Sequence, residues 1–193
     1  SGVEIFGSDS SEIEIIDLLL ESLDLVGLAS SCLSLGRTEV LDEIINDENL
    51  PELKEKKLRE IISDKSESNL IEWCDLNKVD KKSLGKIITL MHSYGDIQCL
   101  EEISSFSKLA KNSVENLKAI TEKISHENIH IDMTDFPGFN YHQGLVFSVH
   151  SQNFGFAIAN GGQYSYQKNS EEKRLAIGFD IDLISLLNIK END

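Results

Sequence analysis

The chain has 193 residues, and its 34 acidic against 18 basic side chains give a formal net charge of -16 at pH 7. That length suits one domain, or a large part of one, with a hydrophobic core of its own. The negative charge opposes contact with a phosphate backbone, so we expect no nucleic-acid partner.

The three cysteines, Cys32, Cys74 and Cys99, are odd in number and lack the paired spacing of a zinc site. We therefore predict reduced thiols in the core and no bound metal. No apolar run reaches the roughly 18 residues of a membrane span, and we expect no signal peptide. These features predict a cytoplasmic protein without a membrane partner.

The N-terminal part of the chain combines a helix and a short strand. Ser11-Glu12-Ile13-Glu14 is a capping box and Gly27 suits a left-handed C-cap, so residues 11–27 are predicted to be helical. Most of the circumference of this helix is Ile, Leu or Val, and we expect it to be covered on more than one side. A strand at 28–35, ended by Gly36, and a helix at 38–45 are predicted next.

The middle of the chain has a helical pattern almost throughout. We predict four or five helices from Pro51 to about Ser125, separated by turns near 63–68, 77–80, 94–96 and 111–112.

From Asn128 the periodicity of apolar residues changes from 3.6 to 2. Phe154, Phe156 and Ile158 are expected on one face of a strand that follows a short hairpin connection. Helices followed by strands joined through hairpins indicate an α+β fold with an antiparallel sheet. The predicted elements are strands at 129–134, 141–150, 154–159 and 175–179, a polar loop at 165–174 and a closing helix at 182–187.

Four short segments carry a family resemblance: Ser1–Ser8 (SGVEIFGS), Tyr141–Phe147 (YHQGLVF), Gly161–Tyr164 (GGQY) and Ala176–Phe179 (AIGF). In this order they resemble the catalytic domain of histidyl-tRNA synthetases and their paralogues. The resemblance implies a class II aminoacyl-tRNA-synthetase-like antiparallel sheet with a helical layer. Motif 1 and most of motif 2 would lie upstream, so residues 1–193 are expected to be the C-terminal portion of one such domain, lacking its N-terminal part. Its sheet-forming segments would be 1–36 and 128–193, and its helical segment 37–126.

Within this family, the motifs favour the regulatory subunit of ATP phosphoribosyltransferase over the synthetase. Pro137 stands where synthetases carry an arginine. Ser185 stands near the position of a second arginine, the motif 3 arginine that contacts ATP in synthetases. Neither side chain can stabilise an anion as a guanidinium does. Tyr141-His142 also matches the regulatory pattern better than the Tyr-Tyr of synthetases.

The resemblance therefore implies a non-catalytic subunit of histidine biosynthesis, with no cofactor and no catalytic residue. Such subunits associate with a short-form ATP phosphoribosyltransferase, which needs them for activity and for feedback inhibition by histidine. The implied partners are that catalytic subunit, a second copy of the chain in a dimer, and free histidine. Two alternatives stay open: a divergent histidyl-tRNA synthetase fragment and a synthetase-like interaction module.

The ligand-pocket candidates also follow from the resemblance. Glu4 stands where a carboxylate meets the α-amino group of histidine, and His142 and Tyr164 stand where the imidazole ring is contacted. A purely structural role within the sheet is as good an interpretation of Glu4 and His142. Gln163 and Ser165 depart from the family pattern Gly-Gly-Arg-Tyr-Asp and remove an ion pair from the pocket. The full set of candidates is Glu4, Tyr141, His142, Gly161, Gly162, Tyr164 and Gly178.

Overall fold

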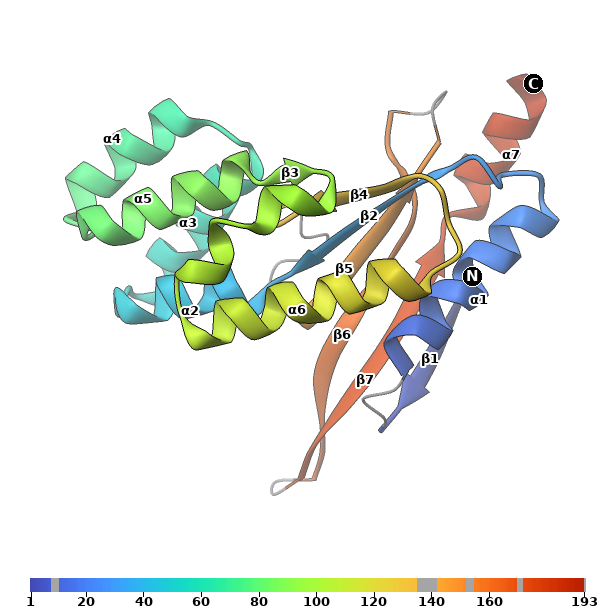
Figure 1. The fold of residues 1–193 in the computed structure, drawn as a ribbon, viewed down its shortest axis with the longest axis horizontal. Coiled ribbons are helices and arrows are strands. Elements are labelled where there is room, and N and C mark those ends of the chain that lie inside the picture. The colour runs from blue at the N-terminus through green and yellow to red at the C-terminus, as the bar shows by residue number, and fades with distance from the viewer. Residues whose placement is uncertain (8–10, 135–141, 152–154, 170–171, 193) are drawn as a thin grey trace.

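The computed structural model describes residues 1–7, 11–134, 142–151, 155–169 and 172–192. Within these residues the strands form a seven-stranded sheet in the order β1-β7-β6-β5-β2-β4-β3 (Figure 1). The strands are β1 (Gly2–Phe6), β2 (Cys32–Arg37), β3 (Tyr94–Gly95), β4 (Ile129–Asp132), β5 (His142–His150), β6 (Ala157–Asn169) and β7 (Glu172–Ile181).

Every pair in this sheet is antiparallel except β2 with β4. A parallel pair needs a long crossover connection, and the helical region between β2 and β4 supplies it. The α+β class is therefore confirmed, with one parallel pair that the sequence pattern did not predict. The short strand β3 lies inside that helical region and pairs with β4 at the edge of the sheet.

Helices cover one face of the sheet and extend beyond one side of it. In Figure 1, α1 and α6 lie across the same face of the strands, whereas α3, α4 and α5 gather beyond β2 and β4. The α-helices are α1 (Ser11–Leu25), α2 (Glu39–Asp47), α3 (Glu52–Ser63), α4 (Glu67–Asn77), α5 (Lys81–His92), α6 (Lys108–Lys123) and α7 (Leu183–Asn192), with 3₁₀ turns at Ile97–Leu100 and Ile103–Ser105. None of the described helices is both long enough and apolar enough to span a bilayer.

One part of the core forms where the apolar face of the sheet meets α1 and α6, and the core continues into the buried faces of α2 to α5. Side chains alternate between the two faces of a strand, and Leu33, Leu35, Phe147 and Val149 all fall on one face and are buried. Helix α1 contributes its own buried stripe, Ile15, Ile16, Leu19 and Leu23, at helical spacing. Burial of these side chains removes apolar surface from water and is the main force that holds the layers together.

Helix α1 ends as its sequence predicts. Gly27 has a φ of 84°, and the Leu28 N–H donates to the Leu23 carbonyl at 2.9 Å, the six-to-one hydrogen bond of a Schellman motif. The prediction that α1 is covered on more than one side is wrong within the described residues. Leu18 is 38% exposed and Leu25 is 89% exposed, because the sheet and α6 cover one stripe of the helix only.

The turn predicted at 111–112 is also wrong. Helix α6 runs through it without a break, and it begins after Ser107, whose Oγ accepts a hydrogen bond from the Ala110 N–H at 3.0 Å. The start of this helix is set by its N-cap rather than by the exposed Lys111-Asn112 pair.

The polar loop predicted at 165–174 is instead part of a long β-hairpin. Strands β6 and β7 pair from Ala159 with Ile181 out to Asn169 with Glu172. Backbone pairing satisfies the N–H and C=O groups of this extension whatever its side chains are, so a mostly polar sequence can form it.

The expected shared face of Phe154, Phe156 and Ile158 is not observed. Phe156 is 76% exposed and precedes β6, whereas Ile158 is buried. Phe154 lies outside the described residues.

Candidate functional site

The second face of the sheet, opposite the one that packs on α1 and α6, carries a row of small residues next to a carboxylate. Backbone register places one residue from each of five adjacent strands side by side. Paired residues in a sheet point to the same face, so these five share one surface. We call them the glycine row: Glu4, Gly178, Gly162, Val146 and Gly36.

Two of the three glycines in this row have no space for a side chain. A Cβ on Gly178 would lie 2.6 Å from the Val3 carbonyl oxygen and 2.8 Å from Cγ of Glu4. A Cβ on Gly36 would collide with the carbonyl oxygen of Asp132, the last residue of the neighbouring strand β4. Gly178 therefore lets the Glu4 side chain lie over the neighbouring strand.

A second row on the same face is polar throughout. On β7, β6, β5 and β2 it lies two residues along the strand from the glycine row, and it continues onto β4. We call it the polar row: Asp180, Asn160, Ser148, Ser34 and His130.

Only part of this face is open to a ligand. Glu4 and Asp180, at the β1 and β7 side, are exposed, whereas Val146 and Ser148 on β5 are 1% and 3% exposed. The accessible part therefore offers carboxylate oxygens beside the half-buried Asn160, whereas Gly162 and Gly178 are buried. Such acceptors suit an ammonium group.

One arginine also belongs to this face. Arg174 precedes Gly178 by four residues on β7, about 13 Å along the strand. It lies on the hairpin extension of β6 and β7, whereas Ser185 lies on α7.

The structure brings some of the predicted pocket residues together and separates others. Glu4, Gly162 and Gly178 meet in the glycine row, and Tyr164, 8% exposed, lies one step along β6 on the same face. His142 pairs with Tyr164 through the backbone. Tyr141, like Pro137, lies outside the described residues.

Gly161 lies on the opposite face from these residues. A Cβ there would collide with the Phe147 ring in the core. The two glycines of the pair therefore face different environments, and the absence of a side chain at Gly161 is explained by core packing.

Gln163 has a structural role on the core side. Its side-chain oxygen accepts a hydrogen bond from the Leu145 N–H at 3.2 Å. This bond spans an irregularity in the pairing of β5 with β6, where Gly144 has a φ of 100°. Gln163, which replaces the arginine of the family pattern, thus forms a hydrogen bond where the regular backbone pairing of β5 with β6 is interrupted.

Ser185 lies in the first turn of α7 and is 7% exposed. Its hydroxyl donates to Asp182 at 2.7 Å, and Asp182 also accepts from the N–H groups of Ile184 and Ser185 at 3.0 and 3.3 Å. The hydrogen bond from the Ser185 hydroxyl is the largest influence that lowers the pKa of Asp182, so this carboxylate stays ionised. Position 185 is thus part of a helix cap.

The serine–histidine pair and the two cysteines with strongly raised pKa values are poor candidates for a nucleophile. The Ser148 hydroxyl lies 2.9 Å from Nε2 of His150, but Ser148 is buried. Burial raises the pKa of the Cys74 and Cys99 thiols to about 11, so both are protonated at neutral pH. Cys74 is in the core as expected, whereas Cys32 and Cys99 are only half-buried. Within the part of the chain that the structure describes, no group of three or more His, Cys, Asp or Glu side chains could hold a metal ion.

The polar row was missed in the sequence. Its signal is the alternation itself, since Ser34, Ser148 and Asn160 each stand one position from a buried apolar residue on their strands. Which polar residues become neighbours depends on the register between strands, and the pattern of a single strand does not contain it.

Comparison with known proteins places this fold in a family. The family model described as histidyl-tRNA synthetase matches residues 1–186. The chain therefore belongs to the histidyl-tRNA synthetase family.

Curated relatives include ATP phosphoribosyltransferase regulatory subunits from several bacteria. The protein from Saccharophagus degradans is 28% identical, with 97% of this chain and 50% of that protein covered. The one from Nitrosomonas eutropha is 29% identical, with 98% and 51% covered. The chain spans about half the length of these relatives.

Solved structures share the fold. A crystal structure from Bacillus halodurans, described as an ATP phosphoribosyltransferase regulatory subunit/histidyl-tRNA synthetase, matches with a TM-score of 0.81 at 20% identity, covering 97% of this chain and 52% of that one. Histidyl-tRNA synthetase from Nostoc sp. PCC 7120 matches with a TM-score of 0.79 at 18% identity, covering 99% and 50%. At these identities the likeness is one of fold.

Proposed function

We propose that the protein is a regulatory, non-catalytic subunit of ATP phosphoribosyltransferase that acts in histidine biosynthesis in the cytoplasm. Its role is to bind a short-form catalytic subunit, raise its activity and make that activity sensitive to histidine. Regulatory subunits with 25–29% identity over 96–100% of the chain support this proposal. A structure described as the ATP phosphoribosyl transferase (HisG:HisZ) complex from Thermotoga maritima shares the fold with a TM-score of 0.72 at 17% identity, covering 93% of this chain and 64% of that one.

The observation that carries the proposal is the environment of Ser185. The family resemblance places there an arginine that contacts ATP in synthetases. Here the hydroxyl of Ser185 donates to Asp182, so a carboxylate stands beside the position of the lost guanidinium. A negative charge repels a nucleotide triphosphate, and amino-acid activation loses one of its anion contacts.

The accessible end of the glycine row is the proposed histidine site. Glu4 is exposed, and no cationic partner of its carboxylate is found among the described residues, so the carboxylate suits the α-amino group of an amino acid. Tyr164 on the same face would contact the imidazole ring. Histidine bound there would favour one state of the catalytic partner, a coupling typically worth about 1–3 kcal/mol. A dimer of this subunit is also proposed, on the family resemblance alone.

Two assays on the complete protein separate this function from that of a synthetase. Size-exclusion chromatography with a short-form catalytic subunit should give a joint peak at micromolar concentration. Charging of histidine tRNA with radiolabelled histidine should stay at the level of a reaction without enzyme. Robust charging would contradict the proposal, and separate elution without charging would favour an interaction module with another partner.

A further inference from the structure

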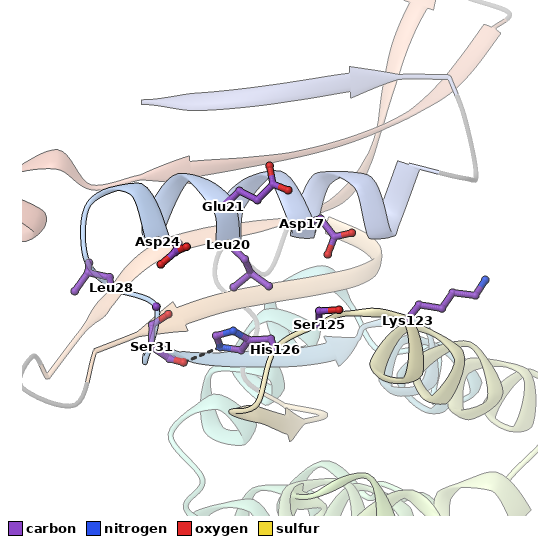
Figure 2. A pocket seen from close by; sticks show the side chains of 10 residues that line it. Asp17, Leu20, Glu21, Asp24, Leu28, Ser31, Lys123, Ser125 and His126 are labelled. Carbon is purple, nitrogen blue, oxygen red and sulfur yellow. Dashed lines mark hydrogen bonds between the residues drawn. The ribbon is translucent and has the colours of Figure 1, made fainter.

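A cleft on the helical side of the sheet has the composition of a cation site. It has a volume of about 370 Å³ and lies between α1 and the segment that follows α6. Figure 2 shows Asp17, Leu20 and Asp24 projecting from α1 toward His126, while Glu21 projects from another side of the helix. This cleft lies on the side of the sheet opposite the glycine row.

The carboxylates along the cleft have no partner. Asp17, Glu21 and Asp24 form no side-chain hydrogen bond and no ion pair within the described residues. Lys123 is at the rim, and its side chain points away from Asp24 in Figure 2. Partial burial, and then the charge of Glu21, raise the pKa of Asp17. The site thus holds negative charge that a cation would stabilise.

An independent observation comes from the β2 side of the cleft. Ser31 lines it and is 3% exposed, and its hydroxyl is buried without a hydrogen-bond partner in the structure. A buried hydroxyl without a partner destabilises the fold, so a donor supplied by a ligand would recover part of that cost.

His126 adds a further acceptor. Its Nε2 lies 2.8 Å from the Ser31 carbonyl oxygen, and a carbonyl only accepts, so Nε2 carries the proton. In the neutral ring Nδ1 is then an acceptor. Carboxylates, a hydroxyl oxygen and Nδ1 together require a ligand rich in N–H donors, and Leu20 and Leu28 offer apolar surface for an aliphatic stem.

We propose that this cleft binds an aliphatic cation with several N–H donors, an alkylguanidinium or alkylammonium group. The group belongs either to a small amine or to an arginine or lysine side chain of another protein. Two carboxylates of α1 neutralise its charge, and Ser31 and His126 accept its hydrogen bonds.

The test is an NMR titration of the complete protein with agmatine, an alkylguanidinium that also carries an ammonium group. Saturable shifts of the Ser31 amide and the His126 ring are expected at millimolar concentration or below. The double variant Asp17→Asn with Asp24→Asn should weaken binding at least ten-fold. Asp75→Asn, an exposed carboxylate on α4, makes the same chemical change elsewhere and should leave the affinity within two-fold.

A second comparison needs no variant. Tetramethylammonium has a positive charge but no N–H group, and it should bind at least ten-fold more weakly than agmatine. A blocked arginyl peptide that binds as tightly as agmatine would identify a protein side chain as the source, and weaker peptide binding would identify a small molecule. The proposal is overturned if agmatine gives no saturable shift, if the double variant binds equally well, or if tetramethylammonium binds as tightly.

Discussion

The substitution Gly178→Ala tests whether β1 packs against β7 as closely as the glycine row requires. The added Cβ would lie 2.6 Å from the Val3 carbonyl oxygen, 2.8 Å from Cγ and 3.2 Å from Cα of Glu4. The nearest of these is a backbone atom of an edge strand, which a change of rotamer cannot move. Strand β1 pairs within the sheet only with β7, so it must shift or separate from its partner.

The expected cost combines two effects. Overpacking of this kind destabilises by about 1–3 kcal/mol. Alanine also restricts the unfolded chain more than glycine does, and this stabilises the folded protein by about 0.4–1 kcal/mol. We therefore expect a net loss of about 1–2 kcal/mol in the free energy of unfolding.

Gly85→Ala is the matched control, because no atom lies within 4 Å of its added Cβ. Gly85 is exposed in the interior of α5 and has no positive φ. Alanine has the higher helix propensity, so this variant should be more stable by about 0.5–1 kcal/mol.

Urea denaturation followed by circular dichroism measures both changes, and hydrogen exchange of the β1 amides locates the first. Faster exchange in β1 should accompany the loss in Gly178→Ala. If that variant is as stable as the parent and its β1 amides are unchanged, the packing of Glu4 over Gly178 is incorrect.

Three further outcomes follow from charged side chains. Arg59 is 8% exposed, and its Nη2 lies 2.7 Å from Oδ1 of Asp42 and 2.8 Å from Oε1 of Glu55. Arg59→Ala should therefore lower the free energy of unfolding by about 1–3 kcal/mol. A change below 0.5 kcal/mol in urea denaturation would show that these two pairs do not stabilise the fold. The hydrogen bond from the Ser185 hydroxyl helps to hold the pKa of Asp182 in the folded protein below its value in the unfolded chain. The ionised carboxylate therefore contributes its full stabilisation of the fold above the unfolded-state pKa, and this stabilisation is lost as the pH falls through the folded-state pKa. Between pH 7 and pH 2.5 the melting temperature of Asp182→Asn should therefore fall less than that of the parent. An equal fall in both proteins would show that Asp182 does not cap α7. Finally, Glu4→Gln should weaken histidine binding at least ten-fold in calorimetry, and unchanged affinity would remove Glu4 from the proposed site.

Local signals in the sequence predicted the elements well where one residue sets the boundary. Gly27 marked the end of α1, and the change of period at Asn128 separated the helical region from the later strands. These features act within a few residues of the chain, so propensity and capping were enough.

The pairing of strands that lie far apart in the sequence could not be predicted from such local signals. The β6–β7 extension is held by backbone hydrogen bonds that its polar side chains do not reveal. The faces of Gly161 and Gly162 could not be assigned without the register, although the two residues are adjacent. The family motifs located Glu4, Gly178 and Tyr164 on a common face, whereas the polar row became visible only when the strands were paired.

We propose that this protein controls a catalytic partner and has no catalytic activity of its own. The most direct measurement is the rate at which a short-form ATP phosphoribosyltransferase joins phosphoribosyl to ATP, with the complete protein titrated in and with histidine added at saturation. We predict that the rate rises to a plateau at one stoichiometry and that histidine then lowers it. A rate that stays the same at every concentration of the protein, with or without histidine, would contradict the claim.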